Sequence, residues 1–201
     1  MPSICDLNRR AVDYSVEIVS RLTPADLDRP TPCTAWNLAD LLSHMTAQHR
    51  GFAASARGQG ADLAVWQPRP PAADPVAAYA DAAADVTAAY AEPDVLERHF
   101  DLPEFAPGFT APGSLAVGFH FIDYVVHGWD VARALGLPYR LDDDLAGPAL
   151  DIALAVPDDE NRRQPGAPFG PAVPPIESAP ALDPALDRLL RALGRSPGWP
   201  D

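Results

Sequence analysis

DYVVHGWDVARALG, residues 123–136, has the apolar content of an amphipathic helix, supplied mainly by its valines and Leu135. The same stretch places a carboxylate and an imidazole four residues apart, at Asp123 and His127. Residues at i and i+4 lie on the same face of a helix. If that face points into the protein, the pair needs a partner there, and a metal ion is one candidate.

Composition favours a helical protein. The chain has 201 residues, which fits one domain or one domain with an appendage, and 47% of them are hydrophobic. Alanine supplies much of that fraction, and alanine is the strongest helix former. The net charge of -13 argues against nucleic-acid and anionic-membrane partners, because both require basic patches.

The cell location is expected to be the cytoplasm. The two cysteines, Cys5 and Cys33, are too few for a disulfide framework. The first residues, MPSICDLNRR, lack the charged and apolar regions of a signal peptide. No apolar run reaches the roughly 20 residues that a membrane-spanning helix needs.

Periodicity and breaker residues predict a mainly α fold with four longer helices, and so a four-helix bundle. The expected domain covers 1–201, with a bundle at about 6–136 and a C-terminal extension at about 137–201. Thr34 and Ser114 are the expected N-caps of the second and fourth helices, and Pro148 is expected to kink the fifth or delay its start. The expected helices span about 6–22, 36–54, 75–90, 114–135, 142–156 and 183–193.

The remaining segments are rich in proline and glycine. A long loop is expected at 55–74, and long loops in compact domains are often functional. Residues 93–113 fit either a short strand pair or an extended crossover, and their pattern does not decide between the two. The C-terminal extension is expected to hold short helices joined by proline-rich connectors.

A metal site needs ligands from more than one helix. His44 lies on or beside the apolar stripe of the second helix, with His49 nearer its edge. His44 together with Asp123 and His127 would supply two nitrogens and one oxygen, and catalytic sites use three protein ligands with an open position. Such donors suit Zn, Fe, Ni or Mn. The alternative is that these histidines are core residues satisfied by hydrogen bonds.

Two motifs carry a family resemblance. TPCTAWNLADLLSHMTAQH (residues 31–49) and DYVVHGWDVARALG resemble the DinB-like metal-binding four-helix bundles. More narrowly, they resemble the actinobacterial branch related to the N-terminal domain of mycothiol-dependent maleylpyruvate isomerase. The marks are a Trp followed eight residues later by His, and an acidic residue one helical turn before a second His. The ending GRSPGW also resembles a subfamily of that branch.

The resemblance implies a divalent-metal site. Its ligands would be His44, Asp123 and His127, the ion would often be zinc, and some members activate a thiol such as mycothiol. One departure is that maleylpyruvate isomerases carry Glu where this chain has Asp123, which is one methylene shorter. Asp123 would then ligate through water, or His120 on the preceding turn would compensate. A second departure is that only about 60 residues follow the fourth helix, which places thiol binding in question.

Other residues are candidates for the surroundings of the site. Asp130 lies three residues after His127, where it would orient that imidazole or pair with Arg133. Trp36, Trp129 and Cys33 are interpreted first as packing residues. The alternatives are a role in lining a pocket for both tryptophans and a reactive thiol at Cys33. His120 and His49 are the nearby titratable groups, and no general base stands out.

The leading hypothesis is a divalent-metal-dependent enzyme that acts on a small organic molecule by thiol transfer or isomerisation. The alternatives are a metal- or small-molecule-binding bundle without catalysis, and a bundle that has lost its metal. A small-molecule substrate is expected under the first hypothesis, and related bundles are often homodimers.

Overall fold

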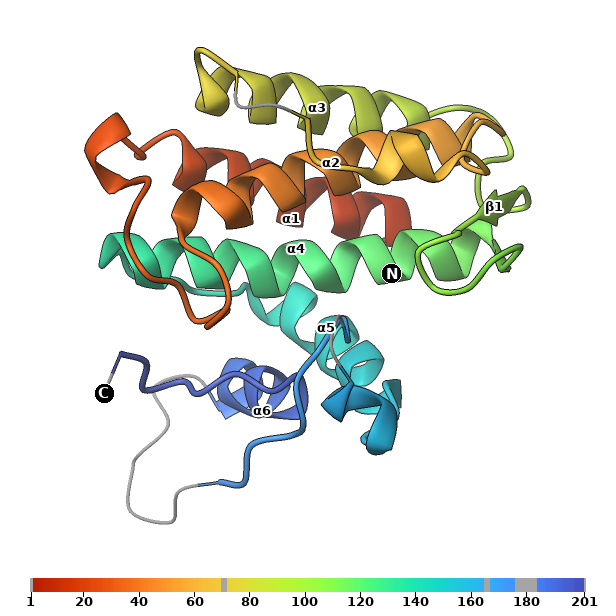
Figure 1. Ribbon diagram of the computed structural model, residues 1–201. Helices are drawn as coiled ribbons and strands as arrows, with labels where there is room; N and C mark the ends of the chain where they lie inside the picture. The colour runs from red at the N-terminus through yellow and green to blue at the C-terminus, as the bar shows by residue number, and fades with distance from the viewer. Residues whose placement is uncertain (1, 70–71, 165–166, 176–183, 201) are drawn as a thin grey trace. The chain divides into compact units, whose positions relative to one another are not determined.

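The computed structural model describes residues 2–69, 72–164, 167–175 and 184–200, and the chain divides into two compact units, Met1–Leu135 and Gly136–Asp201. That these units make up a single domain stays a prediction. The first unit contains four helices that lie side by side (Figure 1). They are α1 (Ile4–Val19), α2 (Leu38–Ala56), α3 (Pro75–Tyr90) and α4 (Gly113–Leu135), as the sequence predicted within a few residues.

Local capping fixes where the bundle helices begin. The side chains of Ser3, Asn37 and Asp74 accept hydrogen bonds from backbone N–H groups of the first turns of α1, α2 and α3. Thr34 is therefore not the cap of α2, because Asn37 takes that position and its backbone N–H donates in return to the carboxylate of Asp40. Ser114 is not the cap of α4 either, because the helix already includes Gly113.

The core of the first unit surrounds α4, which is buried along most of its length. α2 presents apolar residues at helical spacing toward the interior, including Leu38, Leu41, Leu42 and Met45, all at most 2% exposed. Two short 3-10 helices, η1 (Pro24–Asp26) and η2 (Leu63–Trp66), interrupt the connections before α2 and α3. The second of these brings Trp66 into the core within the expected loop.

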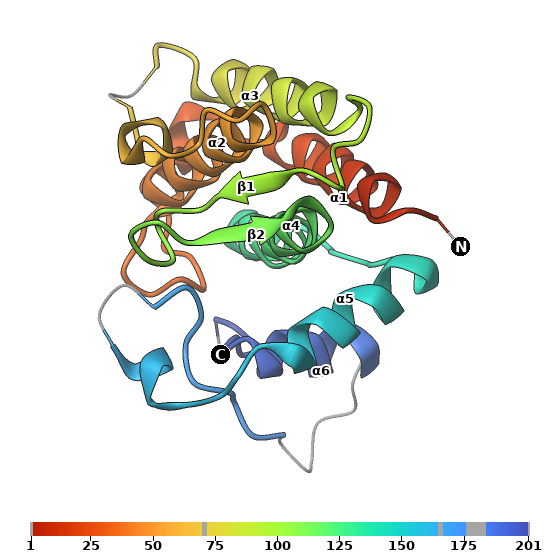
Figure 2. The same ribbon diagram turned by 90° about the vertical axis from the view of Figure 1, so that its right-hand side faces the viewer.

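Residues 93–113 contain a strand pair, which settles the choice that the sequence left open. β1 (His99–Asp101) pairs antiparallel with β2 (Thr110–Pro112), with Phe100 opposite Ala111. Figure 2 shows this hairpin lying between α2 and α4. Phe100 and Leu102 are fully buried, and Ser55 of α2 donates a 2.8 Å hydrogen bond to the carbonyl of Asp101. The hairpin is thus anchored to the bundle at its base.

The second unit contains α5 (Asp143–Ala155), the 3-10 helix η3 (Glu160–Arg163) and α6 (Pro184–Ala192). The expected last helix began at 183, which lies outside the described residues. α5 begins at Asp143 although Pro148 lies inside it, so the expected late start is wrong. A single proline near the start of a helix removes only one backbone hydrogen bond.

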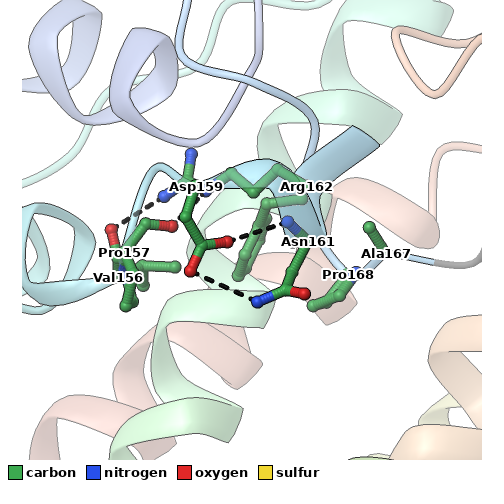
Figure 3. Close-up of a pocket in the computed structure, with 8 residues that line it drawn as sticks. Val156, Pro157, Asp159, Asn161, Arg162, Ala167 and Pro168 are labelled. Carbon is green, nitrogen blue, oxygen red and sulfur yellow. Dashed lines mark hydrogen bonds between the residues drawn. The ribbon is translucent and has the colours of Figure 1, made fainter. Parts of the chain in front are cut away.

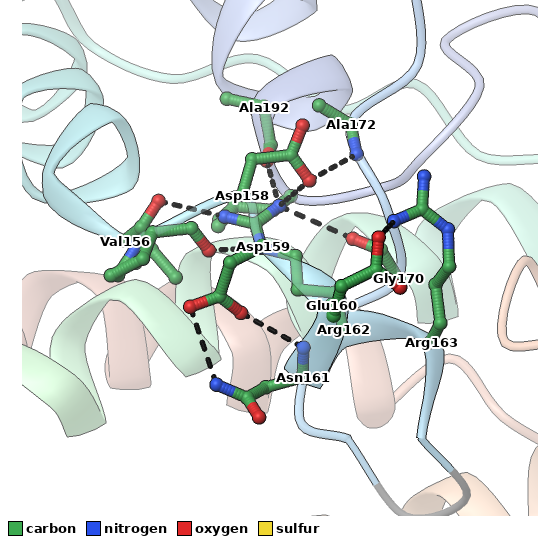
Figure 4. Close-up of polar contacts among 12 residues, drawn as sticks. Val156, Asp158, Asp159, Glu160, Asn161, Arg162, Arg163, Gly170, Ala172 and Ala192 are labelled. Carbon is green, nitrogen blue, oxygen red and sulfur yellow. Dashed lines mark hydrogen bonds and ion pairs between the residues drawn. The ribbon is translucent and has the colours of Figure 1, made fainter.

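Arg162 is the polar centre of the second unit, and it is only 7% exposed. Its guanidinium donates to the carbonyl oxygens of Val156, Pro157, Gly170 and Ala192 at 2.5–3.2 Å (Figure 4). Buried charges need such partners, because removing a charge from water is unfavourable unless hydrogen bonds replace the lost hydration. These bonds join η3 to the end of α6.

Among the described residues, no helix has both the length and the apolar character required to cross a membrane. The cytoplasmic location stays a prediction.

Candidate functional site

The structure brings together the three side chains that the sequence nominated as metal ligands. One ligand atom from each of His44, Asp123 and His127 lies within 4.8 Å of the other two. His44 comes from α2, and Asp123 and His127 come from successive turns of α4. That this group binds a metal stays a prediction, but its geometry is that of a single donor cluster.

His127 is held between two carboxylates. Its Nε2 lies 3.4 Å from Asp123, and its Nδ1 lies 3.0 Å from the fully buried Asp130. Burial alone would lower the pKa of His127, but the charge of Asp123, the hydrogen bond with Asp130 and the nearby Cys33 raise that pKa to about 10. Asp130 therefore lies behind the imidazole, at the position that the sequence suggested.

His44 has the opposite electrostatic character. Burial and the neighbouring charge of His127 lower its pKa to about 4, against the opposing effect of Asp123. Its ring centroid lies 4.6 Å from the ring of Trp36 and 5.3 Å from that of His127. At neutral pH His44 is thus an uncharged imidazole with a lone pair to offer. Trp36 lies beside the cluster, and its role in lining a pocket stays a prediction. Trp129, by contrast, is a core residue at 4% exposure.

The donor set fits a divalent cation such as zinc. Two imidazole nitrogens and one carboxylate oxygen are typical of zinc sites, and bond lengths near 2.1 Å place tetrahedral ligand atoms about 3.4 Å apart. The 3.4 Å separation of the His127 and Asp123 atoms already matches that spacing. Asp123 therefore reaches the cluster despite its shorter side chain, and the structure does not bring in His120 to compensate.

Cys33 lies at the site, although the sequence favoured a packing role for it. Its Sγ donates to the same Asp130 oxygen that contacts His127, at 3.2 Å, and Cys33 is only partly buried. A bridge between Pro30 and Asn37 folds the loop before α2 back on itself. The contact between Cys33 and Asp130 joins residues 97 apart in the chain, so no local spacing in the sequence could have signalled it.

Sequence reasoning missed a hydrogen-bonded pair of side chains about one helical turn from His44. Gln48 follows His44 by one helical turn and donates a 2.6 Å hydrogen bond to the carboxylate of Glu104, in the loop between β1 and β2. Partial desolvation raises the pKa of Glu104, the bond from Gln48 lowers it, and the charge of Asp123 raises it further, with a net upward shift. Glu104 is therefore electrostatically coupled to a ligand of the candidate site.

His49 and His120 lie in the core, in a cluster of their own. Their rings are joined by a 3.2 Å contact between His49 Nδ1 and His120 Nε2, and Asn8 lies 2.7 Å from His120 Nδ1. Burial lowers the pKa of His120 to about 3, and burial together with His120 lowers that of His49 well below its usual value. Both residues are fully buried, and neither joins the donor cluster.

A small hollow in the second unit has a volume of about 170 Å³ (Figure 3). Its polar groups are already paired. Asp159 accepts from the backbone and side-chain amides of Asn161, and the Arg162 donors are bound to carbonyl oxygens. The polar groups of this hollow are therefore engaged with one another, whereas His44, Asp123 and His127 direct their ligand atoms toward one point.

Curated relatives cover nearly the whole chain. Two uncharacterised proteins of Mycobacterium tuberculosis, from the strains CDC 1551 / Oshkosh and ATCC 25618 / H37Rv, are each 30% identical over 194 residues. Each alignment covers 94% of this chain and 96% of the relative.

Solved structures show the same fold. Crystal structures of the mycothiol-dependent maleylpyruvate isomerase and of a histidine-to-alanine mutant of it match with TM-scores of 0.54 and 0.57, at 14% and 13% identity. Each match covers 77% of this chain and 71% of the other. The expected DinB-like helical fold is thus confirmed. Residues 9–132 also match the model of the mycothiol maleylpyruvate isomerase N-terminal domain. The chain therefore belongs to the family of the mycothiol maleylpyruvate isomerase N-terminal domain.

Proposed function

We propose that this protein is a divalent-metal-dependent enzyme that uses mycothiol to transfer a thiol to, or isomerise, a small organic molecule. The observation that carries the proposal is the convergence of His44, Asp123 and His127 on one point. The family supports mycothiol as the thiol, because the similar solved structures are described as mycothiol-dependent. The second unit lies outside the matched residues 9–132, so the proposal of mycothiol as the thiol rests on the first unit alone.

The roles of the chain's own residues follow from their surroundings. His44 offers an uncharged nitrogen, and Asp130 holds His127 by its Nδ1 so that Nε2 faces Asp123. Hydrogen-bonded outer partners of this kind fix the orientation of a ligand imidazole. A bound divalent cation would lower the pKa of a thiol at its open position, so that the nucleophilic thiolate forms at neutral pH.

Metal content is the first test. Protein purified without an affinity tag is expected to contain close to one divalent ion per chain, with zinc the leading candidate. His44→Ala is expected to lose that ion. His99→Ala is the matched control, because His99 is an exposed histidine on β1 outside the cluster, and it should retain the ion.

Thiol chemistry is the second test. The metal-loaded protein is mixed with mycothiol and a panel of small electrophiles that includes maleylpyruvate, and loss of free thiol and isomer formation are followed. Turnover that disappears in His44→Ala supports the proposal, and turnover that survives without metal contradicts it. An ion that is present while no thiol or substrate is consumed supports the alternative, a bundle that binds metal or a small molecule without catalysis.

A further inference from the structure

The hairpin loop spans the two helices that carry the candidate ligands. Glu104 contacts α2 through its 2.6 Å bond with Gln48, and the next residue, Phe105, stacks on Phe119 of α4 with ring centroids 5.2 Å apart. The loop is closed by a 2.9 Å hydrogen bond from the Leu102 N–H to the carbonyl oxygen of Phe109. The loop therefore contacts both α2 and α4.

Helical spacing places Gln48 and Phe119, the two residues that the loop contacts, at similar heights along the helix axes beside the donor cluster. Gln48 comes four residues after His44, and Phe119 comes four residues before Asp123. α2 and α4 run in opposite directions (Figure 1), so these two steps lead the same way. Each step is one helical turn, about 5.4 Å along the axis. The two residues that hold the loop thus lie about one turn from the ligand residues, and the Glu104 carboxylate is close enough for the charge of Asp123 to act on it.

The electrostatic setting of Glu104 differs from that of Glu92 and Glu160. Glu92 pairs with Arg57 and Arg98, and Glu160 pairs with Arg163. For Glu104 the structure gives no cationic partner in the described part of the chain; the groups that face it are the Gln48 amide and, through its charge, Asp123. A carboxyl group set beside another carboxylate and partly removed from water binds protons more readily. Such groups are candidates for proton transfer.

We propose that Glu104 accepts the proton of the thiol that enters the donor cluster and returns it when the thiol leaves. This inference rests on the proposed function. In the forward step the S–H bond breaks, the sulfur keeps the electron pair as a thiolate, and an O–H bond forms on the Glu104 carboxylate. In the reverse step the O–H bond breaks and the sulfur regains its proton. Charge and atoms balance in both directions, and no further reactant is needed.

The inference predicts how many protons leave the protein when mycothiol binds. A free thiol has a pKa of about 8.5, so it is protonated at about pH 6, where a zinc-bound water with a pKa near 7 is still mostly neutral. Calorimetric titrations of the zinc-loaded protein in buffers of different ionisation enthalpy count the protons released. The wild type is expected to release almost none, because Glu104 keeps the proton.

Glu104→Gln is the decisive variant, because its amide oxygen can still accept the bond from Gln48 while it cannot hold the proton. It is expected to release about one proton per thiol bound and to bind mycothiol more weakly, with a zinc content equal to that of the wild type. Glu97→Gln is the control, since Glu97 is an exposed glutamate outside the loop, and it should give the wild-type count.

The outcomes separate this inference from the proposed function. Equal proton release by the wild type and Glu104→Gln, with both binding mycothiol, would overturn the role of Glu104 and leave the proposed function standing. Absence of mycothiol binding by the zinc-loaded wild type would overturn both. A difference of about one proton between the two proteins supports the inference.

Discussion

The Nδ1 atom of His127 lies 3.0 Å from a carboxylate oxygen of Asp130, one helical turn further along the same face of α4. Asp130 is fully buried, and the same oxygen accepts the Cys33 thiol. This contact fixes which nitrogen of His127 faces Asp123. The two hydrogen-bond partners also explain how the Asp130 carboxylate can be fully buried, because an unpaired buried charge would be strongly unfavourable.

Asp130→Asn is expected to weaken metal binding by about 10- to 100-fold, because it removes the charge that orients His127 while it keeps the side-chain shape. The dissociation constant for Zn²⁺ is measured by competition with a chromophoric chelator. Asp142→Asn, an exposed substitution at the start of α5, is the control. A dissociation constant for Asp130→Asn equal to that of the wild type would show that the Asp130 contact does not support a metal ligand.

Metal binding at neutral pH is expected to release about one proton per ion from the protein. The raised pKa of His127, about 10, means that this imidazole is protonated before the ion binds, whereas the pKa of His44, about 4, means that it is already neutral. Affinity should therefore fall by about tenfold for each pH unit as pH decreases from 10 toward 4. Titrations of the metal-free protein at several pH values measure this slope, and an affinity that does not change with pH would contradict the proposed ligand set.

Much of the site could be predicted from sequence because its ligands are local. Asp123, His127 and Asp130 share one helix, and their spacing of four and three residues places them on one face. His44 required the extra information that α2 packs beside α4. The prediction of a four-helix bundle and the family resemblance together supplied that information.

The contacts that the sequence could not predict depend on reversals of the chain. Cys33 reaches Asp130 only because the loop before α2 folds back, and Glu104 reaches Gln48 only because the hairpin crosses between helices. His120 and His49 show the converse error. Their positions on α4 and α2 suggested proximity to the site. His49 lies five residues after His44, and a rotation of about 100° per residue turns it to a different face of α2. His120 lies seven residues before His127, about two turns further along α4, and there its ring meets that of His49.

The metal-free protein is expected to be most stable near pH 6.5 and to lose stability on both sides. The lowered pKa values of His44, about 4, and His120, about 3, leave both neutral when folded, so the unfolded chain binds more protons below 6.5 and stability falls as pH decreases. The raised pKa of His127 has the opposite sign, because its contribution is complete below 6.5 and is lost as pH rises through 10.

Urea unfolding of the metal-free protein at a series of pH values measures this curve. Each group contributes a slope of at most about 1.4 kcal/mol per pH unit inside its own window. His49→Phe is expected to make the acid limb shallower, because it removes a buried imidazole whose pKa burial lowers. An acid limb with an unchanged slope in this variant would mean that the His49–His120 pair is not a source of the acid sensitivity.

Gly51→Ala is expected to destabilise the bundle although alanine is the better helix former. Gly51 lies inside α2, and a Cβ atom there would lie 2.2 Å from Cε3 of Trp66. The Trp66 ring is 2% exposed, and its Nε1 donates a 2.9 Å bond to the carbonyl of Gly60, so it has little freedom to move. Overpacking of this kind costs about 1–3 kcal/mol, which exceeds the roughly 1 kcal/mol that alanine gains over glycine in a helix.

A double-mutant cycle tests that explanation. Trp66→Leu removes the ring that alanine would meet, so in its presence Gly51→Ala should become neutral or stabilising in urea unfolding. The two substitutions would then show a favourable coupling of about 1–3 kcal/mol. If Gly51→Ala is equally destabilising with Leu at position 66, the glycine is required for a reason other than the close approach of the Trp66 ring to α2.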